Sequence, residues 1–337
     1  MSNEEVKVRS EQSVSIFIHD YRSMKYIYDN SPQRWEETAA SACTNALLLR
    51  GLTIKCRMTH KEEEKATADG ILLNRFVPLR YRDQLKRYHD RQVLFVLNME
   101  GEKEKEWSDP QLTNMWDFKI GYRLDSDLPL LYGCGDFDGI DIVGSLLRKY
   151  DAGEIVPPKH RTGLVAMISN CQKVANNRLT VLKAFMNASK VKVFSYGHCE
   201  NNMKTQQTRF NNPNWHSMKL EIFQQHKFGM AYESKNIDQY VTEKIYSCLA
   251  TGVIPIYHGA SDVHLFVPKR SYIDASKFGS VQELIAHVEK VDNDPQLYAS
   301  YFQWDVTNLR LLHRNYCYAP VHCRWCERVA QIRDNKQ

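Results

Sequence analysis

The sequence predicts an α/β protein made of two halves, each with βαβ units around a parallel sheet. Three observations predict it: the length of 337 residues favours two domains, short apolar runs alternate with helical patterns, and a Gly- and Pro-containing stretch at Asp151–Thr162 interrupts that alternation. Strand–helix–strand alternation is typical of βαβ units. We therefore expect an N-terminal domain over residues 1–155 and a C-terminal domain over residues 156–337, with a ligand cleft between them at the carboxyl ends of the strands.

The composition is that of an ordinary soluble globular protein. Apolar residues make up 43% and charged residues 25%, which excludes wholesale disorder, collagen and coiled coil. No apolar stretch approaches the ~18 residues that cross a bilayer, and Met1–Ser10 has no apolar segment typical of a signal peptide or anchor. The net charge of +5 suits an anionic ligand but is too small to require nucleic acid.

In the N-terminal half, apolar runs predict strands and one spaced pattern predicts a helix. The strands are Val14–His19, Ala68–Asn74, Val93–Leu97 and Trp116–Tyr122, and the helix is Trp35–Leu49. In the C-terminal half the alternation is clearer. Strands are expected at Leu164–Ser169, Val191–Tyr196, Phe228–Tyr232 and Val253–Tyr257, and helices at Val174–Phe185 and Val241–Thr251. A capping box of Ser280 and Glu283 opens a further helix.

Chemistry concentrates in Lys227–Gly259, which reads KFGMAYESKNIDQYVTEKIYSCLATGVIPIYHG. An apolar strand ends at Glu233, a polar loop follows, and a helix opens near Thr242. The N–H groups at such a helix start can receive phosphate or a ligand hydroxyl. Lys244 in the first turn opposes the helix dipole, which indicates an anion bound nearby. The alternative is that Glu243 and Lys244 are exposed residues at a helix start with no role in binding, and spacing alone favours that alternative.

This stretch resembles the signature of the α1,3/4-fucosyltransferase family (glycosyltransferase family 10), K-F-x-L-A-F-E-N-x…D-Y-V-T-E-K…A-x-x-P-V-x-x-G. Upstream segments resemble further blocks of the family in the same order: Val93–Gly101 with Trp116–Tyr132, then Val165–Arg178 and Val193–Cys199. The first ninety residues match the family only in the alternation of predicted strands and helices, not in sequence motifs. The resemblance implies a GT-B fold, in which two Rossmann-like domains face each other across a cleft. It also implies inverting transfer of fucose from GDP-fucose to the 3-hydroxyl of an N-acetylglucosamine in a glycan.

Inverting transfer needs a carboxylate to take the proton of the attacking hydroxyl. Glu100 follows the strand at Val93–Leu97 and matches the family's general base, although it could instead be one more glutamate beside Glu102, Glu104 and Glu106. The reaction also needs cations to hold the departing diphosphate.

The resemblance implies donor-binding residues in the C-terminal half. Arg178 and Lys244 match the diphosphate cations, and Glu233 matches a carboxylate beside the fucose or the developing cation. The other matches are polar donor-pocket positions at Ser169, Asn170 and Tyr196, and donor contacts at Tyr240 and Glu243. Two alternatives stay open, since Arg178 could be a solvated helix residue and Tyr196 a half-buried core residue.

Some positions depart from the family pattern. The usual Phe-Glu-Asn is Tyr232–Glu233–Ser234 here, and the acceptor-side histidine motif is not recognisable in Arg75–Gln92. The acceptor therefore stays open between an antenna, the innermost N-acetylglucosamine of an N-glycan, and a residue on a protein. Asp125–Ser126–Asp127 has the D-x-D pattern of a metal–nucleotide site, but we interpret it as structural. We expect no obligatory metal or cofactor, although a divalent cation could stimulate transfer.

Cysteines gather near the C-terminus as Cys317, Cys323 and Cys326. With His313 and His322 they could bind zinc, but the spacing fits no standard finger. Because the family commonly closes its C-terminus with disulfides, we prefer disulfides. The family also implies a glycoprotein of the Golgi held by an anchor that this chain lacks, so we expect a truncated or soluble form. Asn187-Ala188-Ser189 is a glycosylation sequon.

Two other classes of function remain. Arg75–Arg91 interleaves basic and aromatic residues as strand-binding surfaces do, which would favour an RNA-binding module. Asp83 and Asp90 dilute that charge, so we expect no nucleic-acid partner. A catalytically inactive relative that binds nucleotide sugar is the other alternative. The expected partners are GDP-fucose and a glycan or glycoprotein acceptor.

Overall fold

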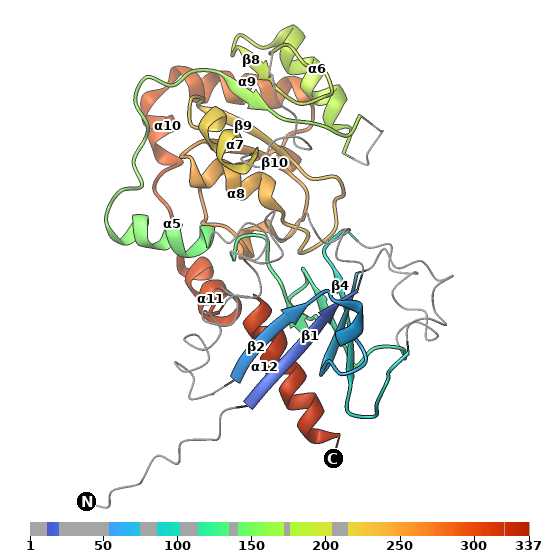
Figure 1. The fold of residues 1–337 in the computed structure, drawn as a ribbon. Helices are drawn as coiled ribbons and strands as arrows, with labels where there is room; N and C mark the ends of the chain where they lie inside the picture. The colour runs from blue at the N-terminus through green and yellow to red at the C-terminus, as the bar shows by residue number, and fades with distance from the viewer. Residues whose placement is uncertain are drawn as a thin grey trace, which may run out of the picture. The chain divides into compact units, whose positions relative to one another are not determined.

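The computed structural model describes residues 12–19, 54–74, 86–101, 114–134, 141–171, 176–203, 215–319 and 321–336. These residues form two compact units (Figure 1). The first contains the described residues of Met1–Leu130 and Tyr318–Gln337, and the second contains those of Leu131–Cys134 and Ile140–Cys317. The C-terminal segment Tyr318–Gln337 therefore belongs to the unit of the N-terminal sheet. The sequence pattern had predicted it as part of a C-terminal domain over residues 156–337. The helix predicted at Trp35–Leu49 lies outside the described residues.

The described strands of the first unit form one parallel sheet in the order β2-β1-β3-β4-β5-β6. Strand β4 is buried at every position, which is why its sequence, VLFVLN, is a continuous apolar run. The predicted strands correspond to β1, β3, β4 and β5, whereas β2 and β6 were not predicted. The bounds are β1 Gln12–Ile18, β2 Ile54–Thr59, β3 Gly70–Asn74, β4 Val93–Asn98, β5 Phe118–Gly121 and β6 Leu128–Pro129, with a 3-10 turn at Glu62–Glu64.

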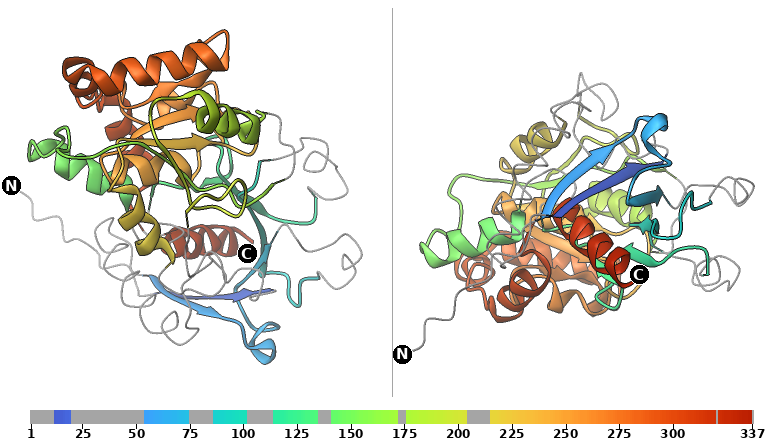
Figure 2. Two further views of the ribbon diagram at one scale, coloured as in Figure 1. Left: turned by 90° about the horizontal axis from the view of Figure 1, so that it is seen from above. Right: turned by 60° about the horizontal axis from the view of Figure 1, so that its bottom comes forward.

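The C-terminal helix α12 (Val321–Asn335) packs against β1, β2 and β4 (Figures 1 and 2). Its buried face includes Trp325 and Val329, both fully shielded from solvent. The Trp325 ring meets Phe95 of β4 edge-on at 6.3 Å between centroids. Burial of these large side chains explains why the end of the chain belongs to the first unit.

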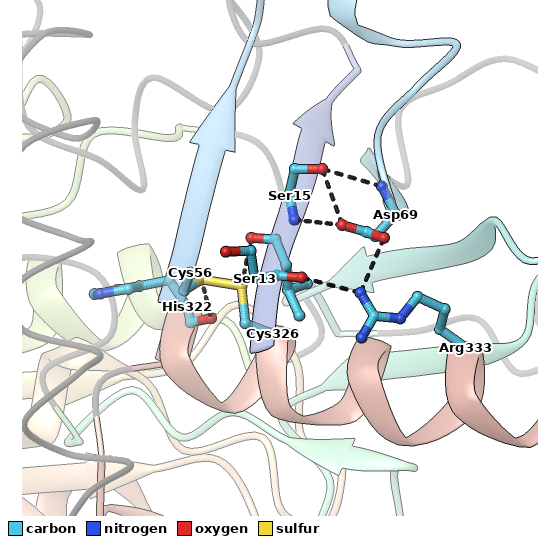
Figure 3. Close-up of a disulfide and its surroundings, with 8 residues drawn as sticks. Ser13, Ser15, Cys56, Asp69, His322, Cys326 and Arg333 are labelled. Carbon is cyan, nitrogen blue, oxygen red and sulfur yellow. Dashed lines mark hydrogen bonds and ion pairs between the residues drawn. A yellow bond between two sulfur atoms is a disulfide. The ribbon is translucent and has the colours of Figure 1, made fainter. Parts of the chain in front are cut away.

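Polar contacts at the same helix fix its register on the sheet (Figure 3). Arg333 donates from Nη1 to Asp69 Oδ1 at 3.0 Å and to the carbonyl oxygen of Ser13 at 3.0 Å. The other carboxylate oxygen of Asp69 accepts hydrogen bonds from the N–H and hydroxyl of Ser15 on β1. A disulfide between Cys56 of β2 and Cys326 of α12 lies beside this network (Figure 3).

The second unit contains a parallel sheet in the order β11-β10-β9-β7-β8 among its described residues. Its first strand, β7, lies between β8 and β9, just as β1 lies between β2 and β3 in the first unit. Each unit thus has a point where the strand order reverses, which is where ligands bind in open α/β sheets. The strands are β7 Leu164–Ala166, β8 Val193–Ser195, β9 Phe228–Tyr232, β10 Ile254–His258 and β11 Ile273–Asp274.

The described helices of the second unit are α5 Ile142–Asp151, α6 Arg178–Ala188, α7 Trp215–Phe223, α8 Glu243–Ala250, α9 Val281–Asn293, α10 Pro295–Ser300 and α11 Thr307–Tyr316, with 3-10 turns at Val263–Leu265 and Ala275–Lys277. Helices α6, α8 and α9 correspond to the predicted helices with shifted bounds, whereas α5, α7, α10 and α11 were not predicted. The predicted Ser280 cap of α9 is confirmed, because Ser280 Oγ accepts from the Glu283 N–H, whereas the Glu283 carboxylate accepts from the N–H of Gly279, one residue before the cap. Within the described ranges, no helix combines the length and apolarity needed to cross a bilayer.

Disulfides account for the C-terminal cysteines. Cys326 pairs with Cys56, and Cys317 pairs with Cys134. Cys323 is also disulfide-bonded, so the prediction of disulfides rather than zinc is confirmed. A further disulfide joins Cys171 to Cys199 in the second unit, while Cys248 is a buried free thiol.

Candidate functional site

The predicted donor residues of the second unit gather around the point where its strand order reverses. Ser169 and Asn170 follow β7, Tyr196 follows β8, and Glu233 follows β9. Because these strands are parallel neighbours, their carboxyl ends lie at one edge of the sheet. The structure therefore brings to one edge residues that lie far apart in the sequence, as the ligand-binding rule for open α/β sheets requires.

The loops after β7 and β8 are held against each other. A Cβ added at Gly197 would lie 2.3 Å from the backbone nitrogen of Ile168, so only glycine permits this close approach. The Cys171–Cys199 disulfide joins the same two loops. Ser169 and Asn170 are exposed there, and Tyr196 is half-buried with its ring edge-on to His226. Burial raises the pKa of Tyr196, so its hydroxyl stays protonated and can donate a hydrogen bond.

Arg178 is the first residue of α6 and is only 6% exposed. Its Nη2 donates to the Asn170 carbonyl oxygen at 3.1 Å, whereas its buried Nε has no hydrogen-bond partner among the described residues. Burial lowers the pKa of Arg178, opposed by Glu233 and Tyr240, but a guanidinium remains charged at any physiological pH. A buried cation with an unused donor can receive an anionic ligand.

Asn176 is a further polar residue at this edge of the sheet, and no motif in the sequence predicted its contacts. It is 7% exposed, and its Nδ2 donates to the Glu233 carbonyl oxygen at 2.5 Å and to Asn236 Oδ1 at 3.3 Å. The contact links the loop before α6 to the end of β9, across 57 residues of sequence. The adjacent asparagines in NNR were the only available signal, and they carry no information about this distant partner.

Glu233 is 0% exposed. One carboxylate oxygen accepts from the Thr242 N–H at 2.8 Å, and the other accepts from the Thr242 hydroxyl at 2.7 Å and lies 3.1 Å from Lys244 Nζ. Burial raises the pKa of Glu233 and Lys244 opposes that rise. The prediction placed Glu233 beside the sugar; the structure engages its carboxylate inside the protein with Thr242 and Lys244.

Lys244 lies in the first turn of α8, and its side chain is 27% exposed. Burial opposes its charge, but the carboxylates of Glu233 and Glu243 raise the pKa of Lys244 above its ordinary value, so the ammonium stays charged. Glu233 and Tyr240 interact electrostatically with both Lys244 and Arg178. Both predicted diphosphate cations are therefore within the electrostatic influence of Glu233 and Tyr240.

Tyr240 and Glu243 flank the start of α8. Tyr240 is 3% exposed and its ring meets Tyr132 edge-on at 6.3 Å. Glu243 is the first residue of the helix, where a carboxylate is favoured by the dipole, and its Oε1 lies 3.4 Å from Lys244 Nζ. The helix start thus contains one cation between acidic neighbours, with backbone N–H groups at its positive end.

Glu100 lies in the first unit and is exposed directly after β4. Its backbone N–H donates to the Oδ1 of buried Asn98 at 3.2 Å, which holds the turn at the carboxyl end of the strand. The carboxylate is therefore at the edge of the sheet where ligands of α/β proteins bind.

The D-x-D segment of the first unit has its carboxylates engaged. Arg123 binds Asp125 through two hydrogen bonds of 2.8 Å, and Asp127 Oδ2 accepts from the Lys119 N–H at 2.8 Å. These contacts agree with a structural interpretation of the segment. In the basic stretch that ends at Arg91, the part described begins at Lys86, and there Arg87 forms an ion pair with Asp117 at 2.8 Å.

Comparisons with known proteins identify the family and the fold of this chain. The profile of the family Glycosyltransferase family 10 (fucosyltransferase) C-term matches residues 156–337. An Alpha-(1,4)-fucosyltransferase of Arabidopsis thaliana is 41% identical over 109 residues, covering 32% of this chain and 27% of the relative. A GDP-fucose protein O-fucosyltransferase 3 of Canis lupus familiaris is 29% identical over 243 residues, covering 67% of this chain and 48% of the relative.

Among solved structures, a crystal structure of α1,3-fucosyltransferase with GDP matches with a TM-score of 0.61 and 16% identity, covering all of this chain and 94% of that one. This likeness shows the GT-B fold predicted from the sequence. The matches with the two curated relatives each span less than half of the relative's length. Since the family profile covers more than half of the chain, this protein belongs to glycosyltransferase family 10, the fucosyltransferases.

Proposed function

We propose that this protein is an inverting fucosyltransferase that moves fucose from GDP-fucose to the 3-hydroxyl of an N-acetylglucosamine in a glycan. The observation that carries the proposal is the buried guanidinium of Arg178 near the reversal point of the second sheet, whose Nε has no hydrogen-bond partner within the described part of the chain. A diphosphate is the ligand that best complements this cation together with Lys244 and the α8 N-terminus.

Each residue that we propose to bind GDP-fucose has a role that fits its surroundings. Arg178 and Lys244 hold the diphosphate and stabilise the charge that develops on GDP as it leaves. Ser169, Asn170, Tyr196, Tyr240 and Glu243 offer hydrogen bonds to the nucleotide and the sugar around them. The relatives that share this fold include a fucosyltransferase crystallised with GDP, which supports the choice of nucleotide.

Glu100 is proposed as the general base. In an inverting transfer the acceptor oxygen bonds to the anomeric carbon as the bond from that carbon to the GDP oxygen breaks, and the hydroxyl proton must go to a base. Glu100 is an exposed carboxylate at the carboxyl end of β4 and can take that proton. Nothing in this step uses a metal, so transfer should persist in a chelator, and a divalent cation should at most stimulate it.

A second acceptor has a specific observation in its favour. The match to a GDP-fucose protein O-fucosyltransferase 3 covers 67% of this chain, against 32% for the α1,4-fucosyltransferase. Transfer to a hydroxyl of a protein is therefore the alternative to transfer to N-acetylglucosamine.

An acceptor panel tests the proposal. The protein is incubated with GDP-fucose and either N-acetyllactosamine, the core of an N-glycan or a folded protein domain with hydroxyl residues, and the product linkage is determined. Fucose in α1,3 linkage to N-acetylglucosamine supports the main proposal, and fucose on Ser or Thr replaces it with the alternative. Binding of GDP-fucose without transfer to any acceptor would indicate an inactive relative, and salt-dependent RNA binding without GDP-fucose binding would overturn both.

We also infer that the protein works in the lumen of the Golgi. Three disulfides among the described residues are typical of a protein that folds in an oxidising compartment. The sequon asparagine Asn187 is exposed at the end of α6. Expression through the secretory pathway should therefore give a glycosylated product whose mass falls by one glycan in Asn187→Gln.

A further inference from the structure

The carboxylate of Glu233 is used entirely within the protein. It is 0% exposed and has three donors: the Thr242 N–H, the Thr242 hydroxyl and the Lys244 ammonium. A carboxylate in these surroundings has no accessible oxygen for a sugar. Any contribution of this carboxylate to donor binding is therefore indirect, through its contacts with Thr242 and Lys244 and its electrostatic effect on Arg178.

Thr242 occupies the N-cap position of α8 with extended backbone, φ −103° and ψ −176°. A threonine at this position ordinarily accepts a hydrogen bond from an N–H of the first turn. Here its side chain makes no such bond: the hydroxyl donates to Glu233, and its oxygen accepts from Lys244 Nζ in place of a first-turn N–H. In the same unit, Asp141, Ser280 and Asp294 do cap their helices through their side chains. Glu233 therefore holds the Thr242 hydroxyl away from the first-turn N–H groups at the positive end of α8.

The same carboxylate fixes the Lys244 side chain. Lys244 Nζ lies 3.1 Å from Glu233 Oε2 and donates to Thr242 Oγ1 at 2.7 Å, so the ammonium is held beside the helix start. The side chain still keeps 27% of its surface exposed. A lysine is otherwise a flexible point charge, and fixing it lowers the entropy that a phosphate would have to overcome on binding.

A second observation, independent of α8, points to an anion at this place. Arg178 is 6% exposed, and its Nε has no partner among the residues that the structure describes. Glu233 acts electrostatically on both Arg178 and Lys244. Two cations and an uncapped helix start thus surround one buried carboxylate. Without Glu233, the Thr242 hydroxyl could turn back to cap the helix and Lys244 would lose its anchor.

We propose that Glu233 is a positioning residue that sets the α8 N-terminus and Lys244 for the diphosphate of the nucleotide sugar, without touching the sugar itself. This inference rests on the proposed function, since it requires that GDP binds at this site. It assigns to Glu233 a role different from the contact with fucose that the family resemblance implies.

The test compares ligands that differ only in phosphate or sugar. Dissociation constants of guanosine, GDP and GDP-fucose are measured by ligand-observed NMR for the wild-type protein and for Glu233→Gln. We expect GDP affinity to fall by about 10-fold or more, because hydrogen bonds to charged groups are among the strong ones, while guanosine affinity stays within about 2-fold. The ratio of GDP to GDP-fucose affinity should not change, since the sugar is not contacted.

Two further variants separate positioning from folding. Thr242→Val removes the hydroxyl that Glu233 binds and should reproduce the selective loss of GDP affinity, whereas Thr242→Ser keeps the hydroxyl and should restore it. Glu283→Gln is the matched control, because Glu283 accepts from the Gly279 N–H at the start of α9 and should leave all three affinities unchanged. If Glu233→Gln fails to fold, the comparison of Thr242→Val with Thr242→Ser still tests whether the contact between Glu233 and Thr242 supports GDP binding.

Each other outcome overturns the inference in a recognisable way. Equal losses for guanosine and GDP would show a merely structural role, and unchanged GDP affinity would show no role at the phosphate. A loss confined to GDP-fucose would show a direct contact with the sugar. Failure of the wild-type protein to bind GDP at all is a different result, because it removes the proposed function itself.

Discussion

Arg178 and Lys244 are two cations with different surroundings and one expected task. Arg178 is buried and donates to a carbonyl oxygen, whereas Lys244 is partly exposed and held by Glu233. Arg offers a planar fork that can bind two phosphate oxygens, and Lys offers a single charged point. Both remain charged at neutral pH, so donor binding should depend on their geometry and not on titration of either group.

Arg178→Lys tests the geometry of the fork. The substitution keeps the positive charge but removes the second donor and the planar shape, so we expect GDP to bind about 10-fold more weakly. Isothermal titration calorimetry measures the affinity. Arg310→Lys is the control, because Arg310 forms an exposed pair with Asp151 and should leave GDP affinity unchanged. Equal GDP affinity in Arg178→Lys and wild type would remove the bidentate role.

Glu100→Gln tests the proposed base. The amide keeps the size of the side chain but cannot take a proton, so turnover should fall by about 10²–10⁴-fold, with GDP-fucose affinity nearly unchanged. Glu63→Gln, at an exposed glutamate of the same unit, should keep full activity. The rate is measured at saturating donor and acceptor. A fully active Glu100→Gln variant would exclude Glu100 as the base.

At the scale of elements, continuous apolar runs were predictable and mixed ones were not. Strand β9 has the predicted bounds because FGMAY is buried throughout. Strand β2, IKCRMT, was missed because Lys55 and Arg57 alternate with its buried side chains and interrupt the apolar run. Helix α12 was not predicted because Cys323, Cys326 and His322 were considered only as disulfide or zinc residues, whereas Trp325 and Val329 determine its packing.

The residues of the candidate site were predictable from motifs, but most of their contacts were not. Motif positions identified Arg178, Glu233 and Lys244. The hydrogen bond from Asn176 to the Glu233 carbonyl spans 57 residues, and no local pattern encodes it. The engagement of Glu233 by Thr242 also depends on how closely α8 approaches β9. There a Cβ on Gly229 would lie 2.6 Å from Cys248 Sγ, so the packing requires glycine.

The disulfide of α12 gives a prediction for this element. Cys56 and Cys326 are 270 residues apart, so their bond constrains a very long loop in the unfolded chain. Replacing both by serine should lower the free energy of unfolding by about 2–5 kcal/mol, measured by urea denaturation followed by the tryptophan fluorescence of the whole chain. The Cys171–Cys199 pair, separated by 28 residues, should cost less when removed in the same way. The reverse order would contradict the chain-entropy explanation.

At the scale of the whole molecule, the sheets of the two units share the same order of their first three strands. In each unit the first strand lies between the second and the third, so each sheet has a reversal point at its carboxyl edge. The second unit has its cations at that edge, and the first has Glu100 at the carboxyl end of β4. The chain's last helix, α12, completes the core of the first unit, so the stability of that unit depends on both ends of the sequence.

Because α12 is part of the core of the first unit, a buried histidine on this helix should make the free energy of unfolding depend on pH. Burial lowers the pKa of His322 on this helix to about 4. In the unfolded chain its pKa is about 6.5, so between those values the unfolded state binds a proton that the folded state does not. The free energy of unfolding should therefore fall as the pH drops from about 6.5 to about 4. Melting temperatures of wild type and His322→Gln measure it: the variant should lose less stability over this range, and identical slopes would exclude His322 as a source.

A crystal structure of this protein grown with GDP tests the nucleotide site most directly. We expect the diphosphate within hydrogen-bonding distance of the Arg178 guanidinium and the Lys244 ammonium, at the first turn of α8, with Glu233 still bound to Thr242. A diphosphate bound away from both cations would contradict the assignment of this edge of the sheet as the GDP-fucose site.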